Sequence, residues 1–465
     1  MSNWNDQKVV IIGAARQGTA LTRYLVQHGA QVVLNDQRQS HELQSAQQDL
    51  AGLPVQWVFG GHPLSLLDGT DLLCLSGGVP LDNPLVVEAQ KQGIPLSNDS
   101  QIFLETAPCR VIGITGSAGK TTTTTLVGRM AQKAVEGTPR RAWMGGNIGF
   151  PLIAVVDEMQ FDDLAILELS SFQTEIMTRS PHIAVILNIT PNHLDRHGTM
   201  EAYTAAKSRL LEFQTEEDIV VLGRDNPGAW QLARKVKGRL FSFGLSEMLS
   251  EGYGTFITGD KIFFKELMLA QPLMDRSIIQ LRGNHNLLNV LAAFAIAAAA
   301  NLPPAAMQAG VEGFSGVPHR LEFVRSWKGT NWYNDSIATT PERAIASLSS
   351  FHENLVLLAG GRDKHLPWDE FAAMVRQRVD HLIVFGEMAD MIMQVVSATN
   401  SSTKRPYTLQ RCAGLKEAVQ AAAQIAEPGD VILLSPGGTS FDEFKDFEER
   451  GERFRRWVND LFLIE

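Results

Sequence analysis

The stretch GITGSAGKTTTTTLVGRM, residues 113–130, decides the fold class, because it predicts a buried strand, a glycine-rich loop and a helix in succession. Gly116 and Gly119 let backbone N–H groups close round an anion, and the helix that follows points its partial positive end at the same place. Lys120 adds a mobile positive charge, and the hydroxyl of Thr121 is suited to hold Mg²⁺. The stretch predicts a nucleotide-binding P-loop; an ordinary glycine turn before a helix is the alternative.

The composition narrows the class of protein. A length of 465 residues predicts about three domains, and the 41 basic against 51 acidic residues give a net charge of −10, which argues against non-specific nucleic-acid binding. The N-terminus lacks the pattern of a secretory signal. The most apolar segment, residues 287–302, contains Asn289 and is expected to be a buried helix rather than a membrane span. We therefore expect a cytoplasmic enzyme that acts on small molecules.

Residues 1–108 predict a Rossmann-like open α/β unit, with a strand, a helix and a second strand that ends at Asp36. The dinucleotide-binding fingerprint needs glycine where Ala15 stands, which disfavours a nicotinamide cofactor. A later strand opens into the loop 76–80, and ligands of open sheets lie outside such strand ends. Two interpretations are open for Asp36, Arg38 and this loop. They either line one pocket or are ordinary turn residues.

Residues 109–314 carry two further candidate strand ends after the P-loop. The buried strand LAILE delivers Glu168 at its end, where a carboxylate can hold Mg²⁺ or can simply be paired at a strand edge. The strand 183–189 leads into a loop with His193 and His197. Histidines at this spacing bind metals chiefly on a helix, so we expect magnesium with oxygen ligands rather than a transition metal.

The segment 199–213 predicts a helix whose core stripe, on spacing, is Tyr203, Ala206, Leu210 and Phe213. Lys207 falls outside this stripe, so spacing alone predicts a solvated lysine.

The strands from IVVLG to IFFKE are expected to form an antiparallel addition to the domain, which a long helix closes. Asn286 and Asn289 lie one turn apart near the start of that helix, where they are placed either to face a ligand or to cap the helix.

Residues 315–465 predict a third open α/β unit. Polar or glycine-rich residues follow three of its strands, at 334–336, 360–364 and 435–440. Three such ends in one sheet indicate a binding edge, although helix capping explains several of them singly.

Eight motifs, taken together, resemble the Mur ligases of bacterial cell-wall synthesis. They span the chain in order: GITGSAGKTTTT, GGNIG, LELSSFQ, NITPNHLDRHG, RGNHNLLN, HRLE, NDSIATTP and SPGGTSFDEFKDFEERG. The last motif is most similar to the members that add D-glutamate. The resemblance implies a UDP-binding domain over 1–108, an ATP-binding domain over 109–314 and a domain over 315–465 that closes on ATP and binds the amino acid.

The resemblance also implies the activity. It is an ATP- and Mg²⁺-dependent carbon–nitrogen ligase that adds D-glutamate to UDP-N-acetylmuramoyl-L-alanine through an acyl phosphate, in the cytoplasmic synthesis of peptidoglycan precursors for cell shape and division. A monomer without nucleic-acid or membrane partners is expected. The alternatives are another Mur-type or folylpolyglutamate-type ligase, and a nucleotide-dependent binding or switch protein without ligase activity.

Each site residue below is implied by the resemblance at the matching position of this sequence. ATP would be bound by Gly116, Ser117, Gly119, Lys120, Thr121, Thr122, Asn286, Asn289, Arg320 and Asp335. The UDP substrate would be bound by Asp36, Arg38, Ser76, Gly78, Asn147 and His193. D-glutamate would be bound by Thr339, Lys364, Ser440, Phe441 and Phe447. The metal groups would be Thr121, Glu168, His193 and Lys207, with a second magnesium near His193 and Lys207 present as N6-carboxylysine. The catalytic residues would be Lys120, His193 and Lys207.

Three positions depart from the family pattern. Ile337 stands where the family commonly has lysine, and Asn192 stands where an acid usually precedes the substrate histidine. The sequence SPGGTS replaces Ser-Pro-Ala-Cys-Ala-Ser but keeps Ser440.

Overall fold

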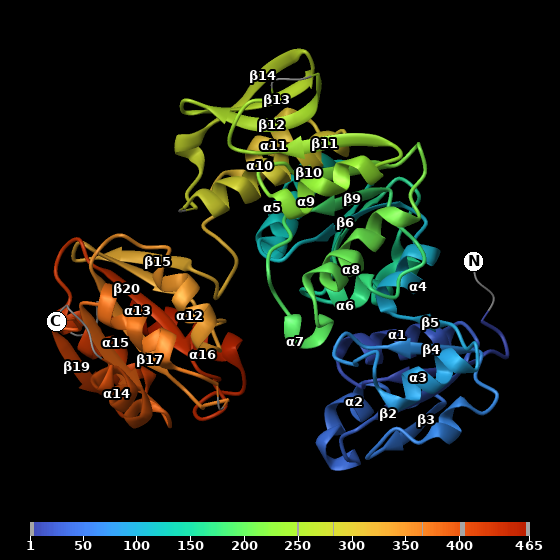
Figure 1. Ribbon diagram of the computed structural model, residues 1–465, viewed down its shortest axis with the longest axis horizontal. Coiled ribbons are helices and arrows are strands. Elements are labelled where there is room, and N and C mark those ends of the chain that lie inside the picture. Colours follow the sequence, from blue (N-terminus) through green and yellow to red (C-terminus); the bar gives the residue numbers. More distant parts are fainter. Residues whose placement is uncertain (1–3, 249–250, 282, 365, 400–404, 462–465) are drawn as a thin grey trace. The chain divides into compact units, whose positions relative to one another are not determined.

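A computed structural model describes residues 4–248, 251–281, 283–364, 366–399 and 405–461, which form three α/β sheets (Figure 1). The chain divides into two compact units. The first comprises Met1–Gln280 and Asn284–Phe314, and the second comprises Leu281–Gly283 and Ser315–Glu465. The predicted class, an α/β fold with mostly parallel sheets, is confirmed, whereas the domain boundaries at residues 108 and 314 stay predictions.

The first sheet has five parallel strands in the order β3-β2-β1-β4-β5. Its elements are β1 Lys8–Ile12, α1 Arg16–Gln27, β2 Gln31–Asp36, α2 Gln44–Asp49, β3 Val55–Phe59, β4 Leu72–Leu75, α3 Pro84–Lys91, β5 Leu96–Ser97 and α4 Asp99–Thr106. The strands are apolar on both faces, as expected for a parallel sheet covered by helices. The strand order reverses between β1 and β4, and their carboxyl ends are therefore the expected ligand edge.

The central sheet has nine strands in the order β14-β13-β12-β11-β10-β9-β6-β8-β7. Its strands are β6 Arg110–Thr115, β7 Ala142–Gly146, β8 Leu164–Glu168, β9 Ile183–Ile186, β10 Ile219–Gly223, β11 Arg239–Phe243, β12 Gly252–Thr258, β13 Lys261–Leu267 and β14 Leu269–Asp275. Its helices are α5 Lys120–Val135, α6 Ser171–Thr174, α7 Leu194–His197, α8 Met200–Glu212, α9 Pro227–Trp230, α10 Asn284–Ala299 and α11 Pro304–Val311.

One expectation about this sheet is wrong. The strands from IVVLG onward were expected to be antiparallel, but β10 pairs in parallel with β9 and β11, and β11 pairs in parallel with β12. Only β12, β13 and β14 are antiparallel. The long connections before β10 and β11 permit parallel crossovers, whereas the two-residue turn between β12 and β13 enforces a hairpin.

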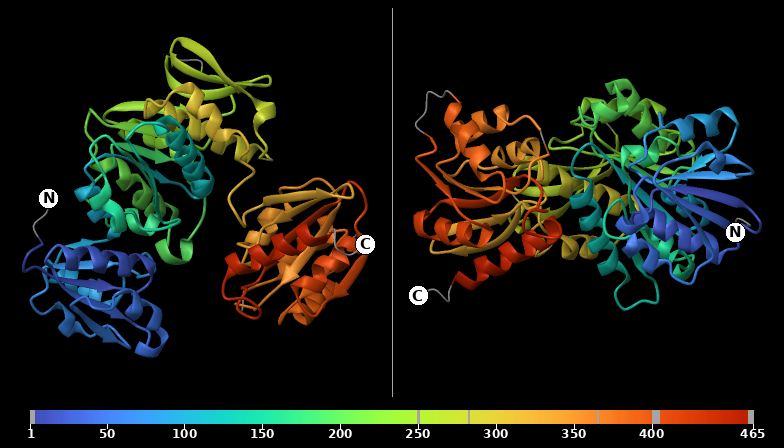
Figure 2. Two further views of the ribbon diagram at one scale, coloured as in Figure 1. Left: turned by 180° about the vertical axis from the view of Figure 1, so that it is seen from behind. Right: turned by 90° about the horizontal axis from the view of Figure 1, so that it is seen from below.

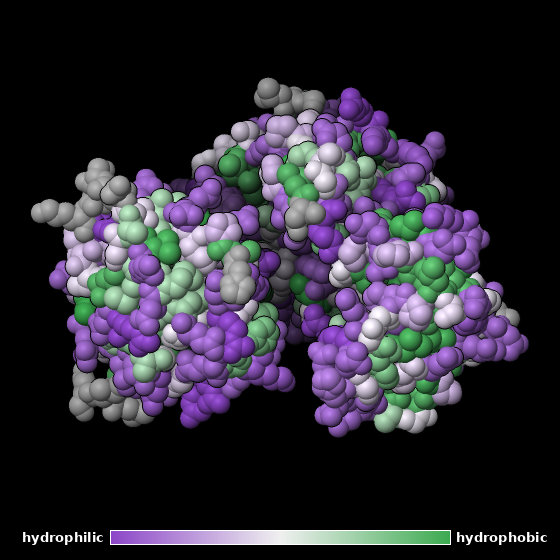
Figure 3. Space-filling model, turned by 60° about the horizontal axis from the view of Figure 1, so that its bottom comes forward, coloured by the Kyte–Doolittle hydropathy of each residue, from purple (hydrophilic) through white to green (hydrophobic). Residues whose placement is uncertain are grey.

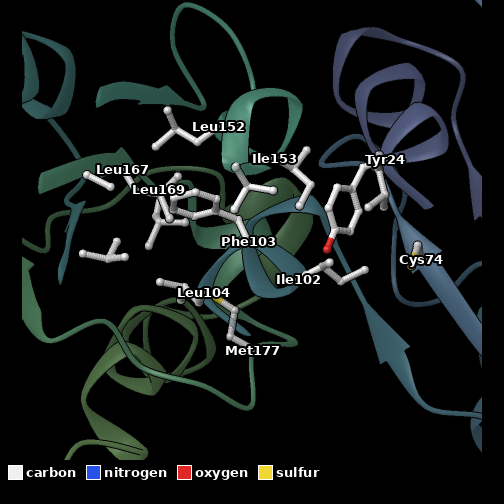
Figure 4. Packing of buried hydrophobic residues seen from close by; sticks show 14 of the residues in the cluster. Tyr24, Cys74, Ile102, Phe103, Leu104, Leu152, Ile153, Leu167, Leu169 and Met177 are labelled. Carbon is white, nitrogen blue, oxygen red and sulfur yellow. The ribbon is translucent and has the colours of Figure 1, made fainter. Parts of the chain in front are cut away.

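One hydrophobic core joins the first sheet to the central sheet within the first unit. Helix α4 supplies its centre: Ile102 lies beside Tyr24 of α1, and Phe103 lies toward Leu169, which directly follows β8 (Figure 4). All four side chains are at most 6% exposed. This shared core fixes the carboxyl ends of the two sheets relative to each other within the unit.

The third sheet has the order β15-β16-β20-β17-β18-β19 and is parallel except for the β15–β16 pair. Its elements are β15 Glu322–Trp327, β16 Thr330–Asn334, α12 Pro341–Leu348, β17 Leu355–Gly360, α13 Asp369–Arg378, β18 His381–Phe385, α14 Ala389–Ala398, β19 Thr408–Arg411, α15 Leu415–Ile425, β20 Val431–Gly437 and α16 Phe447–Asn459. Leu355 and Leu357 face one core while Val356 and Leu358 face another, so helices cover both faces of the sheet (Figure 2).

The surface is mainly hydrophilic on the face that Figure 3 shows, with hydrophobic residues in smaller groups. The apolar segment 287–302 forms most of α10, whose residues from Val290 to Ala297 are fully buried, so the prediction of a buried helix is confirmed. Among the helices of the described residues, none is long and apolar enough to cross a membrane.

Candidate active site

The P-loop lies between β6 and α5, and the strand end of β9 holds it in place. The N–H of Ser117 donates to the Asn188 carbonyl over 3.0 Å, and the N–H of Ala118 donates to the Asn188 side chain over 2.9 Å. Gly119 adopts a left-handed φ of 82° directly before α5. Lys120 opens the helix and donates from Nζ to the Gly116 carbonyl over 2.9 Å. Backbone N–H groups, a helix N-terminus and a lysine thus meet at one place, as phosphate binding requires.

The two asparagines of α10 lie against this loop. A Cβ atom on Gly119 would come within 2.2 Å of Asn289 Oδ1, so the Asn289 side chain touches the loop itself. Asn289 Nδ2 donates to Asn286 Oδ1 over 3.2 Å. The structure therefore brings together the P-loop and both residues that were predicted to hold the adenine.

Lys207 of α8 is buried beside the same loop, with 1% of the residue exposed. Its Nζ donates to Thr115 Oγ1 over 3.3 Å and to the Gly116 carbonyl over 3.2 Å, and it lies over the Tyr203 ring. Burial, and then the charge of Lys120, lower the pKa of Lys207 well below its ordinary value. The solvated lysine predicted from spacing is wrong, because the far side of α8 faces the P-loop; Phe213 of the expected core stripe is 39% exposed instead.

Glu168 ends β8 opposite Ile114, the residue of β6 that leads into the P-loop. It is 1% exposed, and its Oε1 accepts from Asn147 Nδ2 over 2.9 Å. Its Oε2 is buried and has no hydrogen-bond partner among the described residues. A buried carboxylate oxygen without a donor is costly unless a cation neutralises it, so Glu168 fits a Mg²⁺ ion held beside the phosphates.

The segment after β9, expected to be a loop, contains the one-turn helix α7. His193 is exposed and begins the helix with a left-handed φ of 53°. The side chain of His197 is 1% exposed, and its Nε2 lies 2.9 Å from Ser171 Oγ. The two histidines therefore have different surroundings, and only His193 faces outward.

At the carboxyl edge of the first sheet, Asp36 accepts from the N–H of Ala14 over 2.8 Å and from the Arg38 guanidinium over 2.9 and 3.0 Å. Burial would raise the pKa of Asp36, but the hydrogen bonds from Arg38 and Ala14 outweigh it and lower the pKa to about 2. Ser76 Oγ donates to the Gly13 carbonyl over 3.0 Å, which joins the ends of β4 and β1. Asp36 and Ser76 thus flank the point where the strand order reverses.

A cavity of about 310 Å³ lies between the first and central sheets, within the first unit. Ser76 and other residues of the loop 76–80 line this cavity, whereas Asp36 and Arg38 are not among its lining residues. That Asp36, Arg38 and the loop share one ligand site stays a prediction. Asp36 and Arg38 form an ion pair with each other at the end of the neighbouring strand β2. The lining also includes Arg196, and residues that had not been singled out from the sequence, among them Asn98, Phe172 and Gln173.

Arg196 joins this cavity to the segment of His193. Its Nη1 donates to the Gly78 carbonyl over 3.4 Å, and its guanidinium lies 4.7 Å from the centre of the Phe172 ring. The contact places Gly78, a predicted substrate residue, next to the segment that carries His193.

In the second unit, the three polar strand ends belong to the neighbouring strands β16, β20 and β17 and meet at one edge, as predicted. Asp335 is buried there, and its carboxylate accepts from Ser435 Oγ over 2.9 Å, from Ser347 Oγ and from the N–H of Leu321. Burial raises the pKa of Asp335 to about 6 despite these donors. A carboxylate accepts about four hydrogen bonds, so one acceptor position is left for a ligand.

The residues predicted to hold D-glutamate lie along the same edge. Lys364 Nζ is 3.5 Å from Thr339 Oγ1, and burial, followed by the charge of Arg343, lowers the pKa of Lys364. Ser440 is 2% exposed and Phe441 is 61% exposed. The Phe447 carbonyl, in the first turn of α16, accepts from Ser336 Oγ over 2.8 Å.

Two further residues shape this edge. Arg320 lies between His319 and Leu321, which both have positive φ angles, of 64° and 42°. Arg450 of α16, which the sequence reasoning had not singled out, is fully buried and donates to the carbonyls of Ser336 and Gly438 over 2.8 and 3.1 Å. Its position in FEERG was visible in the sequence, but its burial was not.

Three family models match the chain. The model of the Mur ligase MurD-like N-terminal domain matches residues 7–98, that of the Mur ligase middle domain matches residues 114–297, and that of the Mur ligase glutamate ligase domain matches residues 319–438. The chain therefore belongs to the Mur ligase family of ATP-dependent ligases.

Two named relatives that match nearly the whole chain support the same family assignment. The UDP-N-acetylmuramoylalanine--D-glutamate ligase of Acetivibrio thermocellus is 36% identical over 458 residues, which cover 98% of this chain and 97% of that protein. The ligase of the same name from Pelotomaculum thermopropionicum is 38% identical over 462 residues, which cover 99% of both chains.

Solved structures share the fold at low identity. The UDP-N-acetylmuramate-alanine ligase MurC from Thermotoga maritima has a TM-score of 0.56 at 18% identity and covers 98% of this chain and 99% of its own. A MurF ligase from the same organism, in complex with ADP, has a TM-score of 0.52 at 16% identity, with 98% of this chain and 96% of its own covered.

Proposed function

We propose that the chain uses ATP to join the amine of D-glutamate to the alanyl carboxylate of UDP-N-acetylmuramoyl-L-alanine, as a step of peptidoglycan precursor synthesis. The names of the full-length relatives support this substrate pair. The observation that carries the proposal is the cluster at the P-loop, where Lys120, the buried Lys207 and the unpartnered oxygen of Glu168 surround one strand end.

The chemistry follows from these groups. The alanyl carboxylate attacks the γ-phosphorus of ATP, ADP leaves, and an acyl phosphate forms. The amine of D-glutamate then attacks the acyl carbon, and the tetrahedral intermediate loses phosphate and a proton to give the amide. Lys120 and the N-terminus of α5 stabilise the charge on the transferring phosphoryl group, so the reaction needs no protein nucleophile.

Magnesium would neutralise phosphate charge, and Glu168 and Thr121 are the groups of this chain that suit it. We propose a second magnesium near His193. Lys207 would support it as N6-carboxylysine, because a buried lysine with a lowered pKa supplies the neutral amine that adds to CO₂.

The remaining assignments are part of the same proposal. The edge around Asp36, Ser76 and Gly78 would bind the UDP substrate, and the edge around Thr339, Lys364 and Ser440 would bind D-glutamate. The enzyme would work in the cytoplasm as a monomer, with domains over 1–108, 109–314 and 315–465.

An amino-acid screen tests the proposal. Purified chain is incubated with ATP, Mg²⁺ and UDP-N-acetylmuramoyl-L-alanine, and amide product and phosphate are measured for each amino acid, including both glutamate enantiomers. We expect product and phosphate with D-glutamate. Phosphate release that is indifferent to both substrates would identify a nucleotide hydrolase or switch protein instead.

A further inference from the structure

Helices α6 and α7 are joined by a buried contact that centres on His197. Its Nε2 lies 2.9 Å from Ser171 Oγ in the first turn of α6. Its ring is parallel to that of Phe172 within 2°, at a centroid distance of 5.1 Å, and the Tyr203 ring lies 5.2 Å away. Glu175 Oε1 lies 3.8 Å from the other ring nitrogen. A side chain that is 1% exposed thus contacts Ser171 and Phe172 of α6, Glu175 directly after α6, and Tyr203 of α8.

Helix α7 is too short to hold its own shape. It spans four residues, and helices of this length do not persist in water without tertiary contacts. Its N-terminal residue, His193, has a left-handed backbone, which costs energy for a residue with a Cβ atom. An anchor at the other end of the turn is therefore needed to keep His193 in this conformation.

The anchor also orders the side chains around one ring. The His193 and Phe172 rings form a T-shaped pair with centroids 5.2 Å apart, and the Arg196 guanidinium lies 4.7 Å from the centre of the Phe172 ring. Phe172 and Arg196 line the cavity between the two sheets. His193, Arg196 and His197 thus all contact Phe172, and the side chain of His197 is also hydrogen-bonded to Ser171 of α6.

We infer that His197 is a positioning residue: through Ser171 and Phe172 it holds α7 so that Arg196 lines the cavity and His193 stays beside Phe172. This inference rests on the proposed function for the role of His193. It assigns to His197 no contact with substrate and no transfer of a proton.

Three variants separate the two contacts of the anchor, which are the packing of the His197 ring and its hydrogen bond to Ser171. His197→Phe keeps an aromatic ring between Phe172 and Tyr203 but removes the contact to Ser171. Ser171→Ala removes the same contact from the other side. His197→Gln returns a polar group near Ser171 Oγ. The exposed His352→Ala is the control, since it removes a histidine far along the chain from this contact.

Steady-state kinetics supplies the first readout. His197→Phe should raise KM for the UDP substrate and lower kcat, each by about 10-fold, because small misplacements of a substrate-facing group are costly. KM for ATP should stay unchanged. Ser171→Ala should have the same effect, the double variant should be no worse than either single one, and His197→Gln should recover part of the loss. A purely structural role would lower the melting temperature without splitting the two KM values.

Amide hydrogen exchange over residues 193–198 of the free protein supplies a readout that does not depend on catalysis. Both His197→Phe and Ser171→Ala should accelerate exchange there, while His352→Ala should not. Normal exchange and normal kinetics in His197→Phe, or additive effects of the two variants, would overturn the inference. Failure of the wild-type chain to form the amide would refute the proposed function but leave the exchange result decisive for the anchor.

Discussion

Lys120 and Lys207 donate from their Nζ atoms to the same acceptor, the carbonyl oxygen of Gly116, over 2.9 and 3.2 Å. Burial and the charge of Lys120 both disfavour a second positive charge, on Lys207. Lys120 retains partial contact with solvent, but Lys207 is 1% exposed. These surroundings therefore favour the uncharged form of Lys207 beside the partly solvent-exposed Lys120, which suits two different roles.

Replacing Lys207 by methionine should make stability less dependent on pH. The lowered pKa means that the unfolded chain binds this proton more tightly than the folded chain, so wild-type stability rises with pH toward the ordinary lysine value of 10.5. Lys207→Met has no proton to lose at this position. The amount by which its free energy of unfolding exceeds that of the wild type should therefore shrink as pH approaches 10.5. Denaturant unfolding at a series of pH values in CO₂-free buffer measures the difference; an advantage that stays constant would contradict a lowered pKa.

Lys207→Ala should lose ligase activity, and short carboxylates such as formate or acetate should restore part of it if the lysine acts as a carbamate. The added acid would occupy the emptied volume and return the negative group. Initial rates with and without carboxylate measure the rescue. A variant with normal activity would instead mean that Lys207 has no part in turnover.

Lys120→Ala should lower turnover by about 10²-fold or more, since it removes a charge aimed at the transferring phosphoryl group. Lys133→Ala is the matched control on the same helix, because Lys133 is exposed and pairs with Glu136 over 3.1 Å. Product formation at saturating ATP compares the two. Near-normal turnover in Lys120→Ala would contradict the role of Lys120 in stabilising the transferring phosphoryl group.

Gly119→Ala should abolish ATP binding. The new Cβ would lie 2.2 Å from Asn289 Oδ1, and the residue would keep a φ of 82°. Gly137→Ala is a matched control with a φ of 78° but no atom within 4 Å of the new Cβ. Both variants should lose about 1–2 kcal/mol of stability from backbone strain, but only Gly119→Ala should lose nucleotide affinity, as measured by calorimetry.

Glu168→Gln should lose the stabilisation by Mg²⁺ and ATP and should fall in turnover by about 10²-fold, without a loss of intrinsic stability. Asp163→Asn provides the contrast, because the Asp163 carboxylate accepts from the N–H groups of Arg141 and Gln160 and from Trp143. That variant should lose about 1–3 kcal/mol of stability and keep its magnesium response. Thermal melts with and without Mg²⁺–ATP distinguish the two; equal magnesium responses would contradict a metal role for Glu168.

Local pattern was enough to predict much of this molecule. The glycines, Lys120 and the strand before them predicted the P-loop, and polar residues at strand ends predicted the binding edges, because parallel strands present their carboxyl ends together. The alternation of apolar strands and helices likewise predicted the α/β class.

What could not be predicted depends on distant contacts. Lys207 and Arg450 are buried by elements far away in sequence, and no local spacing signals this. The cavity lining combines Asn98 of the first sheet with Gln173 and Arg196 of the central one, so it exists only after the two sheets share a core. The direction of β10 and β11 is also set by pairing partners rather than by strand sequence.

We expect ATP cleavage at this P-loop to be coupled to the joining of two particular substrates. The most direct test is to follow amide product and phosphate together with UDP-N-acetylmuramoyl-L-alanine, ATP and Mg²⁺, adding D-glutamate, L-glutamate or neither. We expect equal amounts of amide and phosphate with D-glutamate and little of either without it. Phosphate release without amide, or amide formation with another amino acid in preference to D-glutamate, would contradict this expectation.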